Sequence, residues 1–411
     1  MLSQFFTLFT QGPFQSVFMS LFRYLPVWMP FLMFGAFYQV WMRYIRTKYL
    51  HEQGTILLEF KIPKEMFKSP VAMEIVLAGL SQPSVGSYID VFFKGRVRPW
   101  FSLELVSIGG QVHFFIWTQK KFKNFIESQV YSQFPTVEIH EVSDYALQTV
   151  YTPEEMKMWG MQLKLTKSDI IPIKSYIEYG MDKDPEEEFK IDPITPMLEY
   201  LGSIKQNEQV WIQILIQPHR KETLKDGRLQ TKNDCKSDMK KEVEKIMKDS
   251  LVKPEKDKPP TLGGLSETQK DTINAMQRSV TKTPFDTMIR GIYIAPKDNF
   301  NPANITGLTS TFKQYGSGNL NGFAPSFTTG YEYPWQDFKG RREEKGKRKL
   351  FDAYRRRSFF NPPYKNFYGR PFVLTTEELA TIYHFPGQVA STPTFSRISS
   401  KKAEAPSNLP L

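Results

Sequence analysis

Cysteine and histidine are scarce in this chain. Cys235 is the only cysteine among 411 residues, so no internal disulfide and no thiolate zinc cluster can form. The five histidines are scattered, and no H-E-x-x-H motif occurs. Because a disulfide framework is excluded, a reducing, cytoplasmic setting is the default expectation for the bulk of the chain.

Sequence signatures of catalysis are also missing. No G-x-x-x-x-G-K-[ST] motif occurs, which excludes a self-sufficient P-loop ATPase. Residues 316–322 carry glycines at G-x-G-x-x-x-G spacing, but no predicted strand precedes them and no predicted helix follows, so a turn is the better interpretation. Cys235 has no predicted base nearby, and no serine lies in a nucleophile elbow.

We therefore predict a protein without enzymatic activity, bound cofactor or metal. One alternative stays open, a metal-dependent hydrolase. In that interpretation His113 and His140 approach each other, because both fall on predicted strands of the same domain.

Aromatic and basic residues are plentiful. Hydrophobic residues make up 40% of the chain and aromatic residues 14%, which excludes wholesale disorder and predicts large cores. Lysine and arginine number 54 against 43 acidic residues, giving a net charge of +11. This surplus favours an anionic partner, which could be nucleic acid, the inner face of a membrane or an acidic protein.

A long uncharged segment lies near the amino terminus. Residues 24–42 carry no charged side chain and would span about 28 Å as a helix, close to the hydrocarbon thickness of a bilayer. Trp28 and Trp41 lie near its ends, where aromatic rings favour the membrane interface. Three cations follow within residues 43–48, so the positive-inside rule predicts that the remaining chain is cytoplasmic.

We predict that residues 1–50 form a retained membrane anchor with a single span at about 24–42. A secretory signal peptide is the competing interpretation, but residues 1–22 lack a basic n-region and no small-x-small cleavage site follows Met42. A buried core helix is the other alternative. Residues 1–22 form either an interfacial helix or a second, poorer span.

The hydrophobic periodicity predicts a first α+β domain at residues 54–150. Ser69 and Pro70 are typical of a helix start, and Gly109-Gly110 is typical of a hairpin turn. The predicted elements are strands at 57–62, 101–108, 112–116 and 136–142, with helices at 70–79 and 122–134. Their order, β-α-β-β-α-β, is that of a ferredoxin-like sandwich.

The same order is predicted again in a second domain at residues 155–330. Its strands fall at 161–167, 209–217, 287–295 and 320–323, and its helices begin at Asp192-Pro193 and Asn301-Pro302. A charged helical insertion at 219–282 interrupts it, with helices predicted at 238–251 and 268–280. The predicted fold class is therefore α+β, with a transmembrane helix before two ferredoxin-like sandwiches.

A basic run dominates the region from 331 to 411, which we predict to be a basic and aromatic loop region with an extended tail. Nine cations and three anions lie between residues 341 and 357, a net charge of +6. Aromatic residues surround the run, and cations with aromatic rings suit nucleic acid or an anionic membrane surface. A solvated loop or a contact with an acidic subunit is the plainer alternative. The predicted anion-binding residues are Arg341, Arg342, Lys347, Arg348, Lys349, Arg355, Arg356 and Arg357.

Several stretches occur in an order typical of one protein family. They are Phe101–Ser107, Phe125–Pro135, Glu138–Val142, Asp192-Pro193 with Gln209–Gln213, Tyr333–Phe338, Leu374–Pro386 and Pro406–Pro410. From about residue 55 onward the chain resembles a bacterial family of uncharacterised membrane proteins linked to type IV secretion and conjugation.

In that family this region commonly precedes a hexameric ATPase domain of the coupling-protein or HerA type. The resemblance implies a bacterial inner-membrane subunit that forms a cytoplasmic collar for a separate P-loop ATPase. It also implies a homo-oligomer, with membrane lipids and DNA as further partners. The alternative hypothesis is a membrane-tethered nucleic-acid-binding protein. The resemblance assigns no catalytic residues.

Overall fold

The computed structural model describes residues 23–63, 68–81, 86–182, 192–225, 228–232, 241, 267–331, 333 and 335–387. The chain divides into two compact units. One consists of Met1–Glu52 with Val85–Val97, and the other of Gln53–Ser84 with Arg98–Leu411.

The first unit contains one long helix, α3 (Leu25–Gln53), which is long and apolar enough to cross a membrane. It begins one residue inside the predicted span at 24–42 and continues past its end, because residues 43–53 contain neither proline nor glycine to stop a helix. Gly54, with a positive φ of 61°, follows the last turn. Only Met42 and Ile45 are buried in the helix, so its apolar side chains face outward. The same unit contains a short helix, α5 (Tyr88–Phe92).

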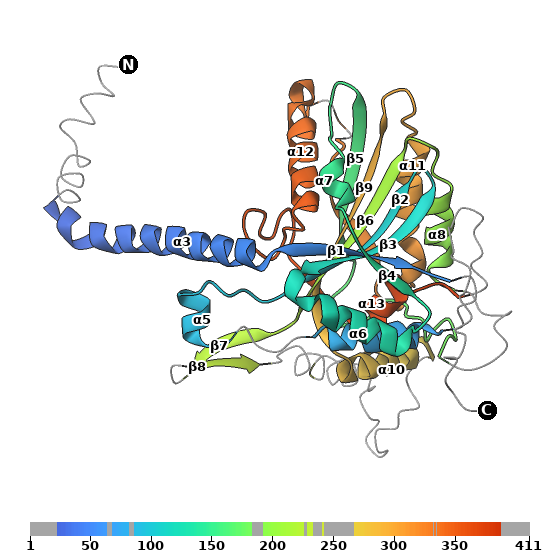
Figure 1. The fold of residues 1–411 in the computed structure, drawn as a ribbon, viewed down its shortest axis with the longest axis horizontal. Helices are drawn as coiled ribbons and strands as arrows, with labels where there is room; N and C mark the ends of the chain where they lie inside the picture. The colour runs from blue at the N-terminus through green and yellow to red at the C-terminus, as the bar shows by residue number, and fades with distance from the viewer. Residues whose placement is uncertain are drawn as a thin grey trace, which may run out of the picture. The chain divides into compact units, whose positions relative to one another are not determined.

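The second unit is built on one continuous antiparallel sheet of nine strands (Figure 1). The strands are β1 (Thr55–Lys61), β2 (Phe101–Ile108), β3 (Gln111–Gln119), β4 (Glu138–Val142), β5 (Met156–Leu165), β6 (Gln209–Pro218), β9 (Pro284–Pro296), β10 (Phe323–Thr328) and β11 (Phe372–Thr375). They lie in the order β10-β5-β9-β6-β2-β3-β1-β4, and β11 pairs with β9. The pairing of β2 with β6 joins the two halves that the sequence predicts as separate domains.

Five helices cover one face of this sheet. They are α4 (Pro70–Gly79), α6 (Lys123–Gln133), α8 (Thr195–Gly202), α11 (Ala303–Ser310) and α13 (Thr376–Ile382). Alternate strand residues point toward them, as the two-residue period of a strand requires. Leu103 of β2 and Ile214 of β6, which are register partners, both belong to a single buried cluster that extends through both halves. The two halves therefore share one core.

The opposite face of the sheet is covered by α7 (Tyr145–Gln148), α12 (Arg341–Arg355) and the segment after α12 (Figure 1). Three polar side chains lie directly opposite one another on this face, namely Glu104, Gln213 and Arg290 on neighbouring strands. All three have no exposed surface. Burying such groups is costly unless they are hydrogen-bonded, so this face must supply their partners.

Most predicted elements lie within a few residues of the observed ones. The helix at 70–79 and the strand at 101–108 have the predicted bounds, and Ser69 caps the helix as expected. The prediction of loops at 331–411 was wrong in part, because the described residues include α12, β11 and α13, with loops between α12 and β11. The sequence analysis did not predict α12, because its many charged residues surround a short buried stripe that includes Leu350, Phe351 and Tyr354.

The predicted insertion at 219–282 lies only partly within the described residues. It begins with a two-stranded hairpin of β7 (Lys221–Lys225) and β8 (Arg228–Lys232), which the sequence did not predict. The helix predicted at 268–280 is confirmed as α10 (Glu267–Thr281). The helix predicted at 238–251, apart from Lys241, and the extended tail predicted from Ser396 lie outside the described residues.

Candidate functional site

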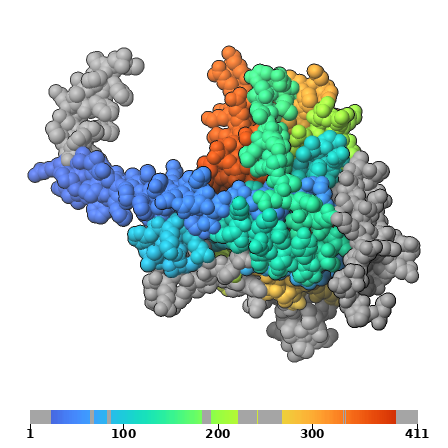
Figure 2. Space-filling model, in the orientation of Figure 1, coloured from blue at the N-terminus to red at the C-terminus, as the bar shows by residue number. Residues whose placement is uncertain are grey.

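Helix α12 carries six of the eight predicted anion-binding residues, and Arg356 and Arg357 follow it directly. Asp337 stabilises its first turn, because the Asp337 carboxylate accepts hydrogen bonds from the main-chain N–H groups of Arg342 and Glu343, both at 2.8 Å. Glu343 and Glu344 lie in the first turn, where negative charge stabilises a helix. Figure 2 shows α12 in orange on the surface of the second unit, which we call the body.

Exposed cations on α12 and on the residue that follows it form a cationic stripe, which we define as Arg341, Arg342, Lys345, Arg348, Lys349 and Arg356. Two members form ion pairs one turn away: Arg348 with Glu344 at 2.7 Å and Arg356 with Asp352 at 2.9 Å. Exposed pairs of this kind contribute little to stability because water and salt screen them, so an anionic ligand could displace them.

Two predicted site residues on α12 lie beside the stripe and are less available. Lys347 is mostly covered and pairs with Glu343 at 2.5 Å. Arg355 lies over the ring of Phe351, with its guanidinium carbon 5.5 Å from the ring centroid. Both residues add to the positive charge around α12, but their side chains already contact Glu343 and Phe351 and are less available to an external anion.

Exposed aromatic rings lie just before the stripe. Trp335 is 77% exposed and Phe338 is 80% exposed, and Tyr333 stacks on Trp335 with ring centroids 4.6 Å apart. Large exposed rings next to cations are typical of surfaces that bind single-stranded nucleic acid or the headgroup region of a membrane. Three exposed rings therefore precede the first turn of α12, where the cationic stripe begins.

Arg357 does not belong to this surface, and its predicted role in anion binding was wrong. Its side chain has no exposed surface. Its Nε donates to Glu104 Oε1 at 3.0 Å, and its Nη2 donates to Glu104 Oε2 at 3.1 Å and to Asp144 Oδ1 at 3.0 Å. Because the Arg357 guanidinium is buried against the sheet and paired with two carboxylates, it cannot contact an external phosphate.

The buried network around Glu104 attaches the α12 region to the sheet. Burial raises the pKa of Glu104, but the charge and hydrogen bonds of Arg357, together with hydrogen bonds from Ser102 and Tyr145, outweigh burial and lower the pKa below its ordinary value. Ser102 and Tyr145 also donate hydrogen bonds to this carboxylate, at 2.6 and 2.8 Å. The charge of Glu104 is thus compensated entirely by groups of the chain.

Arg290 is the second buried cation of this network. Its Nη1 donates to the carbonyl of Ala353 at 3.1 Å, and its Nη2 donates to the carbonyl of Ser358 at 2.8 Å. Burial lowers the pKa of Arg290 to about 9. Because these carbonyls belong to the end of α12 and the residues after it, Arg290 fixes that segment on the sheet. The sequence prediction missed Glu104 and Arg290, although a charge in the middle of an apolar strand was a signal for both.

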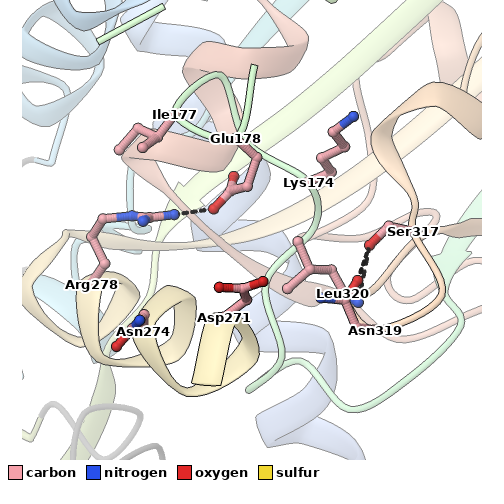
Figure 3. A pocket seen from close by; sticks show the side chains of 9 residues that line it. All are labelled: Lys174, Ile177, Glu178, Asp271, Asn274, Arg278, Ser317, Asn319 and Leu320. Atoms are coloured by element: carbon pink, nitrogen blue, oxygen red, sulfur yellow. Dashed lines mark hydrogen bonds and ion pairs between the residues drawn. The ribbon is translucent and has the colours of Figure 1, made fainter. Parts of the chain in front are cut away.

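A second candidate is a polar hollow of about 380 Å³ on the body (Figure 3). It is lined by Lys174, Ile177, Glu178, Asp271, Asn274, Arg278, Ser317, Asn319 and Leu320. Arg278 forms an ion pair with Glu178 across one side (Figure 3). Lys174 lies over the ring of Tyr179, with Nζ 3.8 Å from the centroid. Two cations and two anions balance each other here, so the hollow has no net attraction for a phosphate.

Buried carboxylates of α13 lie beside this hollow. Glu377 Oε1 accepts a hydrogen bond from Arg278 Nε at 3.2 Å. Glu378 accepts from the main-chain N–H of Ile173 at 3.0 Å and from that of Thr375 at 2.8 Å. Burial nevertheless raises the pKa of Glu378 to about 7.

The shifted Glu378 predicts a pH-dependent stability. Its folded pKa of about 7 exceeds the ordinary value of 4.5, so the native state holds the proton more tightly and its stability falls as the pH rises from 4.5 to 7. The total loss is about 3 kcal/mol at about 1.36 kcal/mol per pH unit. Glu378→Gln should remove this part of the pH dependence, measured by urea unfolding in detergent at pH 5 and pH 7.5. Glu199→Gln, at an exposed position, is the control. If the free energy of unfolding of Glu378→Gln changed between pH 5 and pH 7.5 as much as that of the wild type, the pH dependence would not come from Glu378.

The histidines of the metal alternative have separate partners. His113 Nδ1 lies 2.7 Å from Glu59 Oε1, whereas His140 Nε2 lies 3.2 Å from Glu138 Oε2. Within the described part of the chain, no group of three or more His, Cys, Asp or Glu residues is arranged to hold a metal ion.

A family model described as a domain of unknown function, DUF8128, matches residues 63–397. The chain belongs to the DUF8128 family. The DUF8128 match includes α5, α12 and every strand of the large sheet except β1, while α3 precedes it. No curated protein matches the chain. Membership of DUF8128 assigns no activity to any residue.

Proposed function

We propose that this protein is a non-enzymatic, membrane-anchored subunit whose α+β body lies on the cytoplasmic side of the bacterial inner membrane. The outward-facing apolar surface of α3 carries this proposal. Phe31 is 75% exposed and Phe34 is 69% exposed, and leaving such side chains in water forfeits about 1.5–3 kcal/mol each relative to burial. A bilayer would cover them, and the three cations within residues 43–48 favour a cytoplasmic carboxyl-terminal side.

The anchor is tested by placing a charge in it. Phe34→Arg puts a cation near the middle of the predicted span, at a cost of about 2.5–3.5 kcal/mol on insertion scales. We expect a smaller fraction of the protein to resist alkaline extraction from membranes. Tyr44→Arg is the matched control, because Tyr44 is also exposed on α3 but lies beyond the predicted span. Release of the wild-type protein by alkaline extraction would refute the anchor.

We further propose that the body consists of two ferredoxin-like units fused edge to edge. The element order β1-α4-β2-β3-α6-β4 and the spatial order β4-β1-β3-β2 support the first unit. The order β5-α8-β6-β9-α11-β10 with the spatial order β10-β5-β9-β6 supports the second in the same way. The two β-α-β-β-α-β halves would then be related by an approximate two-fold axis between β2 and β6.

The proposed partner is a separate hexameric P-loop ATPase of the coupling-protein or HerA type, in a translocation complex similar to type IV secretion or conjugation systems. Copies of this chain would form a collar between that ATPase and the membrane. The support is the sequence resemblance, together with the anchor. Purification in mild detergent should recover the ATPase and an oligomer of this chain, whereas a lone monomer under gentle conditions would contradict the proposal.

Nucleic-acid binding is the second candidate function. The specific observation in its favour is the cationic stripe of α12 beside the exposed rings of Tyr333, Trp335 and Phe338. Binding of single-stranded DNA that weakens steeply with salt would support this candidate. DNA binding and membrane anchoring do not exclude each other, because a membrane-bound complex that translocates DNA must also contact the DNA.

A further inference from the structure

A short segment of the first unit is folded against the carboxyl-terminal half of α3. Ser87 precedes helix α5 and closes a capping box: the Ser87 hydroxyl accepts from the N–H of Asp90 at 3.3 Å, and the Asp90 carboxylate accepts from the N–H of Ser87 at 3.0 Å. The segment therefore has a defined conformation rather than that of an open loop.

Specific contacts fix α5 to α3. The Trp41 indole N–H donates to the main-chain carbonyl of Phe92 at 3.1 Å. The Tyr38 and Phe92 ring centroids lie 6.3 Å apart, and Tyr88 stacks on Phe92 at 4.3 Å. Tyr38 and Trp41 both belong to the last part of the predicted span, so α5 lies at its cytoplasmic end.

Gly95 brings the two backbones together. Its φ is +68°, and a Cβ at this position would lie 2.4 Å from the carbonyl carbon and oxygen of Ile45. Only glycine permits both the left-handed conformation and this close approach. Ile45 is one of the two buried residues of α3, which shows that the segment after α5 covers the helix there.

The outer side of the segment is apolar. Tyr88 is 40% exposed, Ile89 is 60% exposed and Phe93 is 63% exposed. The exposed cations Lys94 and Arg96 follow directly. An apolar cluster next to cations is typical of helices that lie in the interface of an anionic membrane.

The position of the segment matches the width of that interface. Its contacts on α3 run from Tyr38 to Ile45, which is about 10 Å along a helix. The headgroup region on each side of a bilayer is only about 5–8 Å thick. A segment that contacts α3 over this stretch therefore reaches the headgroups whenever the predicted span at 24–42 occupies the hydrocarbon core.

We propose that residues 86–97 form a membrane-interface element seated in the anionic cytoplasmic leaflet. Tyr88, Ile89 and Phe93 contact the upper acyl chains, while Lys94 and Arg96 bind lipid phosphates. The proposal rests on the membrane anchoring proposed above. Continuity with the apolar surface of α3 favours lipid as the occupant, because Ile89 and Phe93 extend the surface that the bilayer already covers. The element would fix the depth and rotation of α3.

The test places a fluorescent label at single cysteines. Cys235→Ser gives a cysteine-free parent, since no other cysteine exists. Labels at Ile89→Cys and Phe93→Cys probe the segment, and a label at Phe31→Cys probes the predicted span. A label at Ser132→Cys, which is exposed on α6, gives the accessibility of a position in water. The labelled full chains are reconstituted in vesicles of phosphatidylglycerol and phosphatidylcholine. We expect labels at 89 and 93 to be quenched by headgroup-level nitroxide lipids and to be severalfold less accessible to iodide than the label at 132.

The outcomes separate this proposal from the anchor itself. A lipid-quenched label at 31 with iodide-accessible labels at 89 and 93 overturns the interface element and leaves the anchor intact. Labels at 89 and 93 that resist both quenchers also overturn it, because a protein partner would then cover them. Iodide access at 31 overturns both proposals.

A glycine pair supplies a second test. Gly95→Ala should dislodge the segment and raise iodide access at position 93, because the new methyl group would overlap the Ile45 backbone. Gly54→Ala is the matched control: its φ is also positive, at +61°, but no atom lies within 4 Å of the added Cβ. Equal iodide access in the two variants would show that the contact with α3 does not seat the label in the membrane.

Discussion

Replacing Arg357 by methionine is expected to lower the free energy of unfolding by about 3–5 kcal/mol, because it leaves a buried charge without its partner. Glu104 has no exposed surface, and its main compensation is the Arg357 guanidinium. Chemical unfolding of the full chain in detergent measures the loss. Arg356→Met is the matched control, since the Arg356 side chain is 59% exposed and pairs with Asp352 on the surface. It should cost less than about 1 kcal/mol.

The pH dependence identifies the cause of this loss. In the wild type the pKa of Glu104 is held below its ordinary value of 4.5, so the pair stabilises the fold above that pH and the stabilisation is lost as the pH falls. In Arg357→Met the unpaired carboxyl is destabilised when it ionises. The difference between the two proteins should therefore be larger at pH 7 than at pH 4. A difference that does not change with pH would indicate lost packing instead.

Removing four charges from the cationic stripe is expected to weaken the binding of single-stranded DNA by about three orders of magnitude at 0.05 M salt. The variant carries Arg341→Gln, Arg342→Gln, Lys345→Gln and Lys349→Gln, the stripe residues that do not pair with a carboxylate of α12. Each phosphate contact on a single strand contributes about 0.7 to the slope of log K against log salt, so the slope should fall by roughly 3.

A second variant removes the same charge elsewhere on the body. It replaces the exposed residues Lys164, Lys205, Lys297 and Lys313 by glutamine. If binding depends on the stripe, this control keeps most of its affinity and its salt slope. Equal losses in both variants would show that net charge alone attracts the polymer, and the second candidate function would lose its support.

Local signals were sufficient to place most of the helices and strands. Ser69 followed by Pro70 starts α4, and the alternation of Phe101, Leu103 and Leu105 defines β2. These signals are short-range, because capping and strand periodicity act over a few residues. Pairing between strands is not short-range, which is why the sequence did not reveal that β2 and β6 join the two halves in one sheet.

The candidate site was predicted less well for the same reason. The charge of the run at 341–357 is visible in the sequence, but whether each cation faces water depends on distant partners. Arg357 is buried because Glu104, more than two hundred residues earlier, lies beneath it. The neighbouring Arg356 stays exposed with a partner one turn away. Nothing in the local pattern distinguishes these two arginines.

The two ends of the large sheet restrict how copies of this chain can associate. β10 contains Pro325 and an irregular register at that point, and β4 is short and carries Glu138, His140 and Glu141. Such edges resist the addition of another strand. A ring of copies would therefore assemble through side-chain contacts of helices and loops rather than through backbone hydrogen bonding. An assembly of that kind would depend on individual side chains, so single substitutions at the contact should dissociate it, and it would present no open strand edge for backbone-paired fibre growth.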